Sequence, residues 1–207
     1  MRLCFAAAGL VLLAGFAVTA KADVINPNFT SSNPFPGYGP VPGWTETGAG
    51  TGSTTFNTSG FWNNGTLPAG DTTAGFIQGT GSFSQSLSGL NVGQTYTLSF
   101  YDNARDLTGA NCCNATPTLI ASVGSTDIFS GTVSSVGDSH LFNFVTGTFT
   151  ATSATETLMF ASSTSGDGAL LLSDVSLAAT PEPSSLLLLG TAVLGAAGLV
   201  KRRFAQS

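Results

Sequence analysis

The chain has 207 residues, of which 42% are hydrophobic and only 8% are charged, and its net charge is −5. Residues 23–180 contain ten acidic residues and a single cation, Arg105. Binding to nucleic acid or anionic lipid needs several Lys or Arg side chains on one face, so both are poor partners for that region, and no nucleic acid partner is expected. Neutral sugars, cations and other proteins remain admissible.

The N-terminus has the pattern of an export signal. Met1 and Arg2 form a short charged start, residues 3–18 are an apolar run, and Ala20-Lys21-Ala22 is a small-x-small site. This pattern predicts a signal peptide of residues 1–22, removed by signal peptidase after Ala22. Cys4 would leave with it.

Residues 23–178 are predicted to form one all-β domain of about eight or nine strands, because Gly, Asn and Ser punctuate short segments that lack helical periodicity. The clearest strand is 95–101, where Tyr96, Leu98 and Phe100 alternate with polar residues. Residues 91–94 form a turn before it, and 82–87 is expected to be its hairpin partner. Further strands are expected at 24–29, 75–78, 117–123, 126–129, 141–152, 156–161 and 169–177.

One expected strand contains a change of parity. Phe142 and Phe144 alternate with one phase, whereas Phe149 and Ala151 have the other. A bulge near Thr146-Gly147 would place all four side chains on one face. The number of strands and their irregular loops favour a two-sheet sandwich of jelly-roll type.

The densest polar cluster follows the clearest strand and includes Asp102, Asn103, Arg105 and Asp106. Arg105 could make bidentate hydrogen bonds to sugar hydroxyls or to a ligand carboxylate. Alternatively, it pairs with Asp102 or Asp106 and holds the loop in place. We treat Asp102, Asn103 and Arg105 as candidate ligand contacts.

Cys112 and Cys113 are adjacent, and no other cysteine remains once Cys4 is removed. In an exported chain this pattern predicts a vicinal disulfide that stiffens a loop. Bridges between molecules, or two free thiols, are the alternatives.

Aromatic residues in loops are candidates for stacking on sugar rings. Trp62, beside Phe61 and Asn63, is the better candidate for an exposed platform, whereas Trp44 in a Pro-Gly-Trp turn is expected to pack at the core edge. The sequence shows no arrangement of residues typical of a catalytic site. His140 is the only histidine and is expected on the surface, and the pattern does not place two carboxylates across a cleft. We therefore predict a protein that is not an enzyme.

The C-terminus combines three features: Pro181, Glu182 and Pro183, an apolar run from about 185 to 200, and Lys201, Arg202 and Arg203. The run is near the lower length limit for a bilayer-spanning helix, and the cations should remain cytoplasmic. The preceding domain would then lie on the periplasmic side of the inner membrane.

This order of features resembles the PEP-CTERM sorting signal, here residues 179–207. The resemblance implies a Gram-negative bacterium that makes extracellular polysaccharide, an exosortase that processes the chain near the motif, and a transient hold in the inner membrane before the protein reaches the cell surface or the medium. A plain C-terminal anchor helix is the alternative.

The domain resembles the galactose-binding-like jelly rolls. The resemblance is carried by Asn26-Pro27-Asn28-Phe29, by Val41-Pro42-Gly43-Trp44, by residues 82–100 and by the closing segment 172–177. It implies carbohydrate binding and, in many members, a structural calcium between the first and last strands. Only Asp174 matches the expected carboxylates, because Thr30 and Ser173 stand where acids are usual. No other cofactor is expected.

Together these features predict an exported, non-catalytic protein that associates with exopolysaccharide. A structural matrix protein without a defined glycan ligand is the second hypothesis, and a glycan hydrolase is the third.

Overall fold

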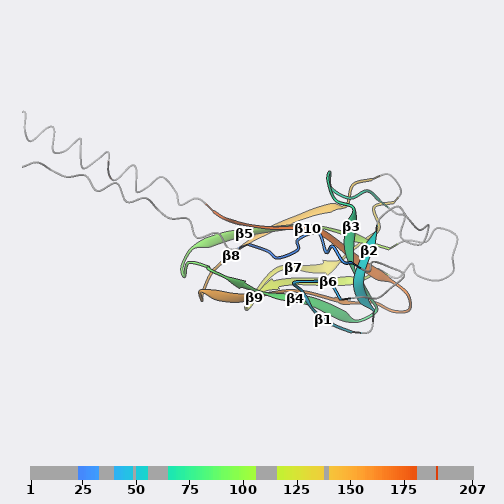
Figure 1. Ribbon diagram of the computed structural model, residues 1–207, viewed down its shortest axis with the longest axis horizontal. Coiled ribbons are helices and arrows are strands. Elements are labelled where there is room, and N and C mark those ends of the chain that lie inside the picture. Colours follow the sequence, from blue (N-terminus) through green and yellow to red (C-terminus); the bar gives the residue numbers. More distant parts are fainter. Residues whose placement is uncertain are drawn as a thin grey trace, which may run out of the picture.

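The computed structural model describes residues 23–32, 40–48, 50–55, 65–105, 116–137, 140–180 and 190. These residues form two five-stranded sheets that face each other in two layers (Figure 1). All strand pairs within the two sheets are antiparallel. The all-β, two-sheet jelly-roll sandwich predicted from the sequence is confirmed. Within the described ranges, no helix combines the length and the apolarity needed to cross a bilayer.

Sheet A has the strand order β1-β4-β9-β6-β7. Its strands are β1 (Thr45–Thr47), β4 (Gly81–Ser88), β9 (Thr155–Ser163), β6 (Thr118–Val123) and β7 (Thr126–Thr132).

Sheet B has the strand order β2-β3-β10-β5-β8. Its strands are β2 (Thr51–Thr55), β3 (Thr73–Gln78), β10 (Ala169–Ala179), β5 (Thr95–Ala104) and β8 (Asn143–Thr150). The last strand of the chain therefore lies in the middle of its sheet.

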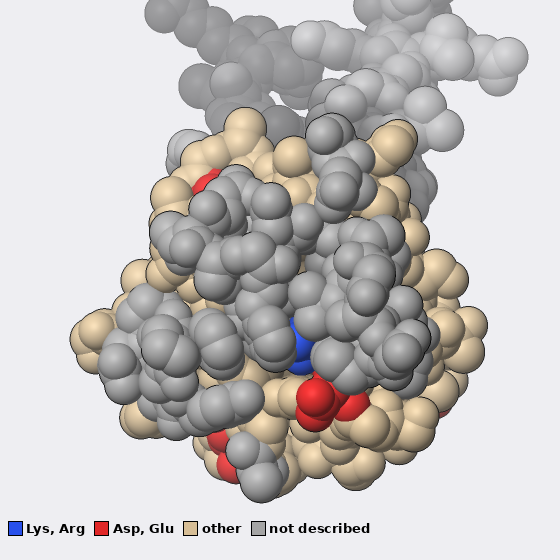
Figure 2. All heavy atoms as spheres, turned by 90° about the vertical axis from the view of Figure 1, so that its right-hand side faces the viewer, with Lys and Arg blue, Asp and Glu red and all other residues tan. Residues whose placement is uncertain are grey.

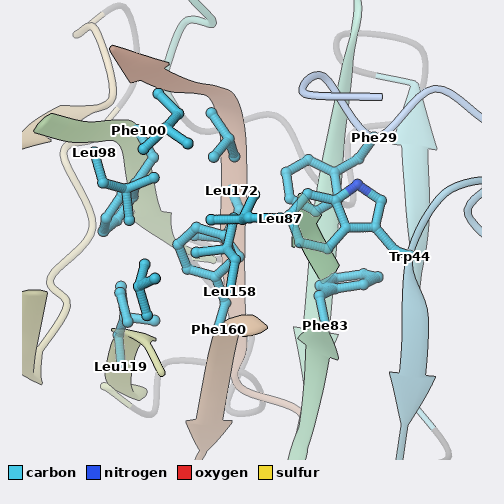
Figure 3. Packing of buried hydrophobic residues seen from close by; sticks show 14 of the residues in the cluster. Phe29, Trp44, Phe83, Leu87, Leu98, Phe100, Leu119, Leu158, Phe160 and Leu172 are labelled. Atoms are coloured by element: carbon cyan, nitrogen blue, oxygen red, sulfur yellow. The ribbon is translucent and has the colours of Figure 1, made fainter. Parts of the chain in front are cut away.

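The main core fills the space between the sheets, because alternate side chains of each strand point inward. Figure 3 shows Leu158 and Phe160 of sheet A near Leu98 and Phe100 of sheet B, and Phe83 of sheet A beside Phe29 and Trp44. The rings of Phe100 and Phe160 meet edge to face, with centroids 5.0 Å apart. Tyr96, Leu98 and Phe100 are all buried, as the alternation predicted.

Residues 23–32 pack against one side of this core without forming a strand. Asn26 and Phe29 have φ values of 50° and 53°, which are incompatible with extended backbone. The strand predicted at 24–29 is therefore wrong. Phe29 stacks on Trp44 with ring centroids 4.7 Å apart and covers Gly75, where a Cβ atom would lie 2.5 Å from its ring. Trp44 is buried, as expected, and its Nε1 donates to Asn26 O (3.0 Å).

The predicted hairpin of residues 82–87 with 95–101 is also wrong. β4 pairs with β1 and β9 in sheet A, whereas β5 pairs with β10 and β8 in sheet B. The turn at 91–94 crosses from one sheet to the other. Turn residues signal a reversal of the chain, but they do not say whether the next strand joins the same sheet.

The predicted bulge at Thr146-Gly147 is absent, because β5 and β8 pair in unbroken register from Thr95–Thr150 to Asp102–Asn143. The apolar residues of the two phases instead lie on opposite faces of sheet B. Phe149 enters the main core, whereas Phe142 joins a second apolar cluster with Phe76 and Leu171. The Thr-rich strands β1 and β2 were not predicted.

Neighbouring residues of β9 test the alternation directly. Phe160 is fully buried, whereas Met159 is 36% exposed on the outer face. Phe160→Ala should lower the free energy of unfolding by about 3–5 kcal/mol through lost burial and a residual cavity. Met159→Ala should lower it by less than about 1 kcal/mol. Denaturant unfolding of the processed protein measures both, and equal losses would contradict this assignment of faces.

Candidate functional site

The three polar residues predicted at the end of the clearest strand are brought together, but they are buried. Asp102 and Asn103 lie near the end of β5, and Arg105 is the first residue after it. The exposed fractions of Asp102, Asn103 and Arg105 are 2%, 0% and 1%. Figure 2 shows this end of the sandwich, where the coloured basic atoms form one small spot beside acidic atoms. Arg105 is the only Lys or Arg among the residues described.

These side chains connect the end of β5 to other segments. Arg105 donates from its backbone N to Ala169 O (2.9 Å) and from its guanidinium to Asp167 O (3.1 Å), so it holds the loop before β10. Asn103 Oδ1 accepts a hydrogen bond from Val136 N (3.0 Å). The arrangement stabilises this end of the sandwich, and direct contact of these side chains with a ligand stays a prediction.

Asp102 is a buried carboxyl group with an altered proton affinity. Burial raises its pKa from 3.8 to about 6, and a hydrogen bond from Asn143 Nδ2 (3.2 Å) opposes the shift. Near pH 6 the group is therefore part protonated, whereas an exposed Asp would be ionised.

An aromatic pair lies beside this end, on the outer face of sheet B. Tyr101 and Phe144 are paired in register across β5 and β8, and their ring centroids are 5.1 Å apart with an interplanar angle of 55°. Phe144 is 58% exposed. Tyr101 is half-buried and packs against the second apolar cluster, so it holds the exposed ring in place.

Hydroxyl groups continue this face along the strands. Ser99 pairs with Thr146, and Thr97 pairs with Thr148, on the same side as the aromatic pair because side chains two residues apart share a face. An exposed ring is thus bordered by hydrogen-bonding groups without a formal charge. Sequence reasoning missed this face because it assigned Phe144 to the core with Phe142.

A second polar cluster joins the start of the chain to the closing strand. Asp71 accepts hydrogen bonds from Asn28 Nδ2 (2.5 Å) and from Ser173 Oγ (2.6 Å). Burial raises the pKa of Asp71, and the nearby charge of Asp174 raises it further. Asp174 has a φ value of 49° at the irregular part of β10 between Ser173 and Ser176.

The predicted calcium position therefore has more donors than Asp174 alone. Asn28 Oδ1 is buried without a hydrogen-bond partner, on the amide whose nitrogen contacts Asp71. Two mutually repelling carboxylates and an unsatisfied amide oxygen suit a hard cation, which takes further oxygens from backbone and water. No group of three or more His, Cys, Asp or Glu side chains that could hold a metal occurs in the described part of the chain. Asn28, Asp71 and Asp174 would be the ligands here.

The outer face of sheet A has an open groove of about 360 Å³. Its lining includes Ile120 and Met159, which are 41% and 36% exposed, among Ser and Thr hydroxyls such as those of Ser82 and Thr118. None of the described residues that line this groove is aromatic.

Several predicted site residues lie outside the described residues. They are Trp62, the cysteines Cys112 and Cys113, and the sorting-motif residues Pro181, Glu182, Pro183, Lys201, Arg202 and Arg203. The expected signal peptide and most of the expected C-terminal helix also lie outside them. His140 is exposed, as expected.

The raised pKa of Asp102 predicts a pH-dependent stability. A carboxyl with a higher pKa in the folded state contributes stability that is present below pH 4 and is lost as the pH rises to about 6. Asp102→Asn should therefore flatten the profile and stabilise the protein by about 2–3 kcal/mol at pH 7. Urea unfolding between pH 3.5 and 7.5 measures this, with the exposed Asp127→Asn as control. An unchanged profile in Asp102→Asn would contradict the assignment.

A calcium ion held by Asn28, Asp71 and Asp174 would stabilise the folded protein. Ca²⁺ at a hundredfold excess over Kd should raise the free energy of unfolding by about 2.7 kcal/mol. Asp174→Asn should remove most of this effect, whereas Asp167→Asn, an exposed acid elsewhere, should retain it. Thermal unfolding with Ca²⁺ and with EDTA measures the difference. No shift in Tm with Ca²⁺ would argue against the site.

Comparisons with known proteins support the sorting motif in the C-terminal tail and the sandwich fold of the domain. Residues 179–203 match the model of the PEP-CTERM protein-sorting motif. The Stig cyclase FisC from Fischerella sp. TAU is similar over 78% of this chain and 98% of its own, with 16% identity and a TM-score of 0.54. At that identity the similarity concerns the fold alone. No curated protein matches the chain.

Two structures with bound sugars are similar at lower TM-scores. TmCBM61, in complex with β-1,4-galactotriose, has a TM-score of 0.45 and 12% identity over 74% of this chain and 99% of its own. The CBM22-1–GH10 modules of the Clostridium thermocellum xylanase 10B, in complex with xylohexaose, have a TM-score of 0.45 and 15% identity over 79% and 29%. The chain thus has a jelly-roll sandwich followed by a PEP-CTERM sorting motif, which indicates an exported protein with a C-terminal membrane-anchoring region.

Proposed function

We propose that this protein is a non-catalytic component of the cell surface or extracellular matrix that binds polysaccharide through the outer face of sheet B. In this proposal signal peptidase removes residues 1–22, residues 23–178 form the functional domain, and exosortase processes residues 179–207. The inner membrane holds the tail only until processing. The exposed ring of Phe144 is the observation that carries the binding proposal.

The physical support is the combination of an anchored ring and neutral hydroxyls. Sugar rings have apolar C–H faces and hydroxyl rims, so a partner needs a flat apolar surface with hydrogen-bonding groups beside it. Phe144 offers such a surface, and Tyr101 limits its movement. The Ser99–Thr146 and Thr97–Thr148 pairs extend this face with hydroxyls. An exposed aromatic side chain backed by a second ring is typical of interaction sites.

The charge balance supports a neutral ligand. Residues 23–180 have ten acids and one cation, and that cation is buried. Long-range attraction of an anionic polymer is therefore weak or repulsive. A neutral or weakly charged polysaccharide meets no such barrier.

The residues predicted from the sequence have different places in this proposal. Asp102, Asn103 and Arg105 position the end of β5 next to Tyr101, because they are buried and bonded to neighbouring segments. Trp62, which lies outside the described residues, remains a proposal for a second aromatic platform. The vicinal disulfide of Cys112 and Cys113 remains a proposal for the loop after Arg105.

Phe144→Ala should weaken binding by about tenfold, the equivalent of about 1.4 kcal/mol. Affinity electrophoresis in gels that contain the organism's exopolysaccharide, and in gels with neutral galactan or xylan, measures the retardation. Val92→Ala, which removes a side chain 66% exposed at the other end of β5, is the matched control. Ile120→Ala probes the groove of sheet A.

The outcomes separate the rival functions. If Ile120→Ala lost its retardation and Phe144→Ala kept it in full, binding would lie on sheet A and the proposed face would be refuted. No retardation of the unmodified protein in any polymer would favour a structural matrix protein without a glycan ligand. Release of shorter chains from the polymer, abolished by Asp102→Asn, would establish a hydrolase and refute the non-catalytic assignment.

A further inference from the structure

The closing strand stays bonded within sheet B up to the residue before the Pro-Glu-Pro motif. Thr180 N donates to Thr95 O (2.9 Å), and Gln94 Nε2 donates to Thr180 O (2.8 Å). The hydroxyls of Thr180 and Thr97 are 3.2 Å apart. The backbone N–H, the carbonyl and the side chain of Thr180 are therefore all engaged.

Gln94 is itself fixed in the turn between β4 and β5. Its backbone N donates to Asn91 O (3.0 Å), and its O accepts from Ala151 N (3.0 Å). Its side-chain nitrogen also donates to Thr95 O (3.0 Å). The amide that contacts Thr180 O is thus held by the end of the sandwich, which we call the exit end and define as residues 91–94, 151–154 and 180.

Pro181 ends the strand pairing of β10 because of its own chemistry. Pro181 has no backbone N–H and cannot continue strand pairing, and it favours extended backbone at Thr180. The match to the sorting motif nevertheless begins at residue 179, the last residue of β10. The first two matched residues are therefore part of the folded sandwich.

This leaves almost no linker between the fold and the motif. Pro183 is three residues beyond Thr180, a reach of at most about 10 Å, and Leu186 is six residues beyond it, at most about 20 Å. An enzyme that acts near Pro181–Pro183 would have to contact the exit end, or draw the end of β10 out of sheet B.

The exit end favours an enzyme over lipid as its partner. Its described residues include no Lys or Arg, and Val92, a large apolar side chain, is 66% exposed there. It therefore lacks the cations that attract anionic headgroups. We infer that the membrane-embedded sorting protease meets a folded sandwich at the exit end, and that the hydrogen bonds that join Thr180 to Gln94 and Thr95 slow processing until this residue is released.

The test uses the full chain in a host that contains the exosortase and lacks the polysaccharide, so the result is independent of glycan binding. Pulse-chase labelling measures the conversion of precursor to processed protein. Gln94→Ala should speed conversion by about fivefold, because the released state of Thr180 becomes more populated. Insertion of Gly-Ser-Gly-Ser-Gly-Ser between Thr180 and Pro181 should speed it at least as much.

Gln78→Ala is the control, because Gln78 lies at the opposite end of sheet B, where it pairs with Ala169. It should leave the rate unchanged, and equal thermal stability of the processed products shows that the sandwich is intact. Acceleration by the insertion alone would overturn the role of Gln94. Unchanged or slower conversion in both variants, or no conversion of any form, would overturn the inference as a whole.

Discussion

The central position of β10 in sheet B is the constraint on which the rest of the structure depends. This strand pairs with β3 on one side and β5 on the other. Leu170 and Leu172 enter the main core, whereas Leu171 enters the second apolar cluster on the outer face. Because the last strand completes both hydrophobic clusters, the sandwich needs the chain almost as far as its sorting motif.

The same strand connects the features that bear on function. Ser173 bonds to Asp71 in the proposed cation cluster, and Ala169 O accepts from the backbone of Arg105. At its other end, β10 leads to Thr180 at the exit end. Tyr101 lies six residues beyond Thr95 in β5, so the aromatic pair is about 20 Å along the strand from the exit end.

The sequence predicted those parts of the fold that depend on a pattern within one short segment. The alternation of Tyr96, Leu98 and Phe100 identified β5 and its buried face, because a period of two is visible within one strand. The pairing of β5 with β10 joins residues about 75 positions apart, for which a single sequence has no local signal. The expected hairpin of β4 and β5 was wrong for this reason.

The candidate site was only partly visible. The cluster of Asp102, Asn103 and Arg105 was found, but the neighbouring backbone groups that bury these side chains could not be foreseen. Phe144 was assigned to the core because sheet B has apolar clusters on both faces, so parity alone cannot tell inside from outside. Asp71 was missed because its contact with Ser173 spans 102 residues.

Hydrogen–deuterium exchange of the full chain in membrane vesicles tests the central claim most directly. If β10 is a central strand that remains paired up to the sorting motif, peptides that cover residues 169–180 should be protected together, including the amide of Thr180. Protection of Ala169–Leu172 with exchange at the rate of an unstructured peptide over 177–180 would contradict the account, because the fold would then end before the tail begins.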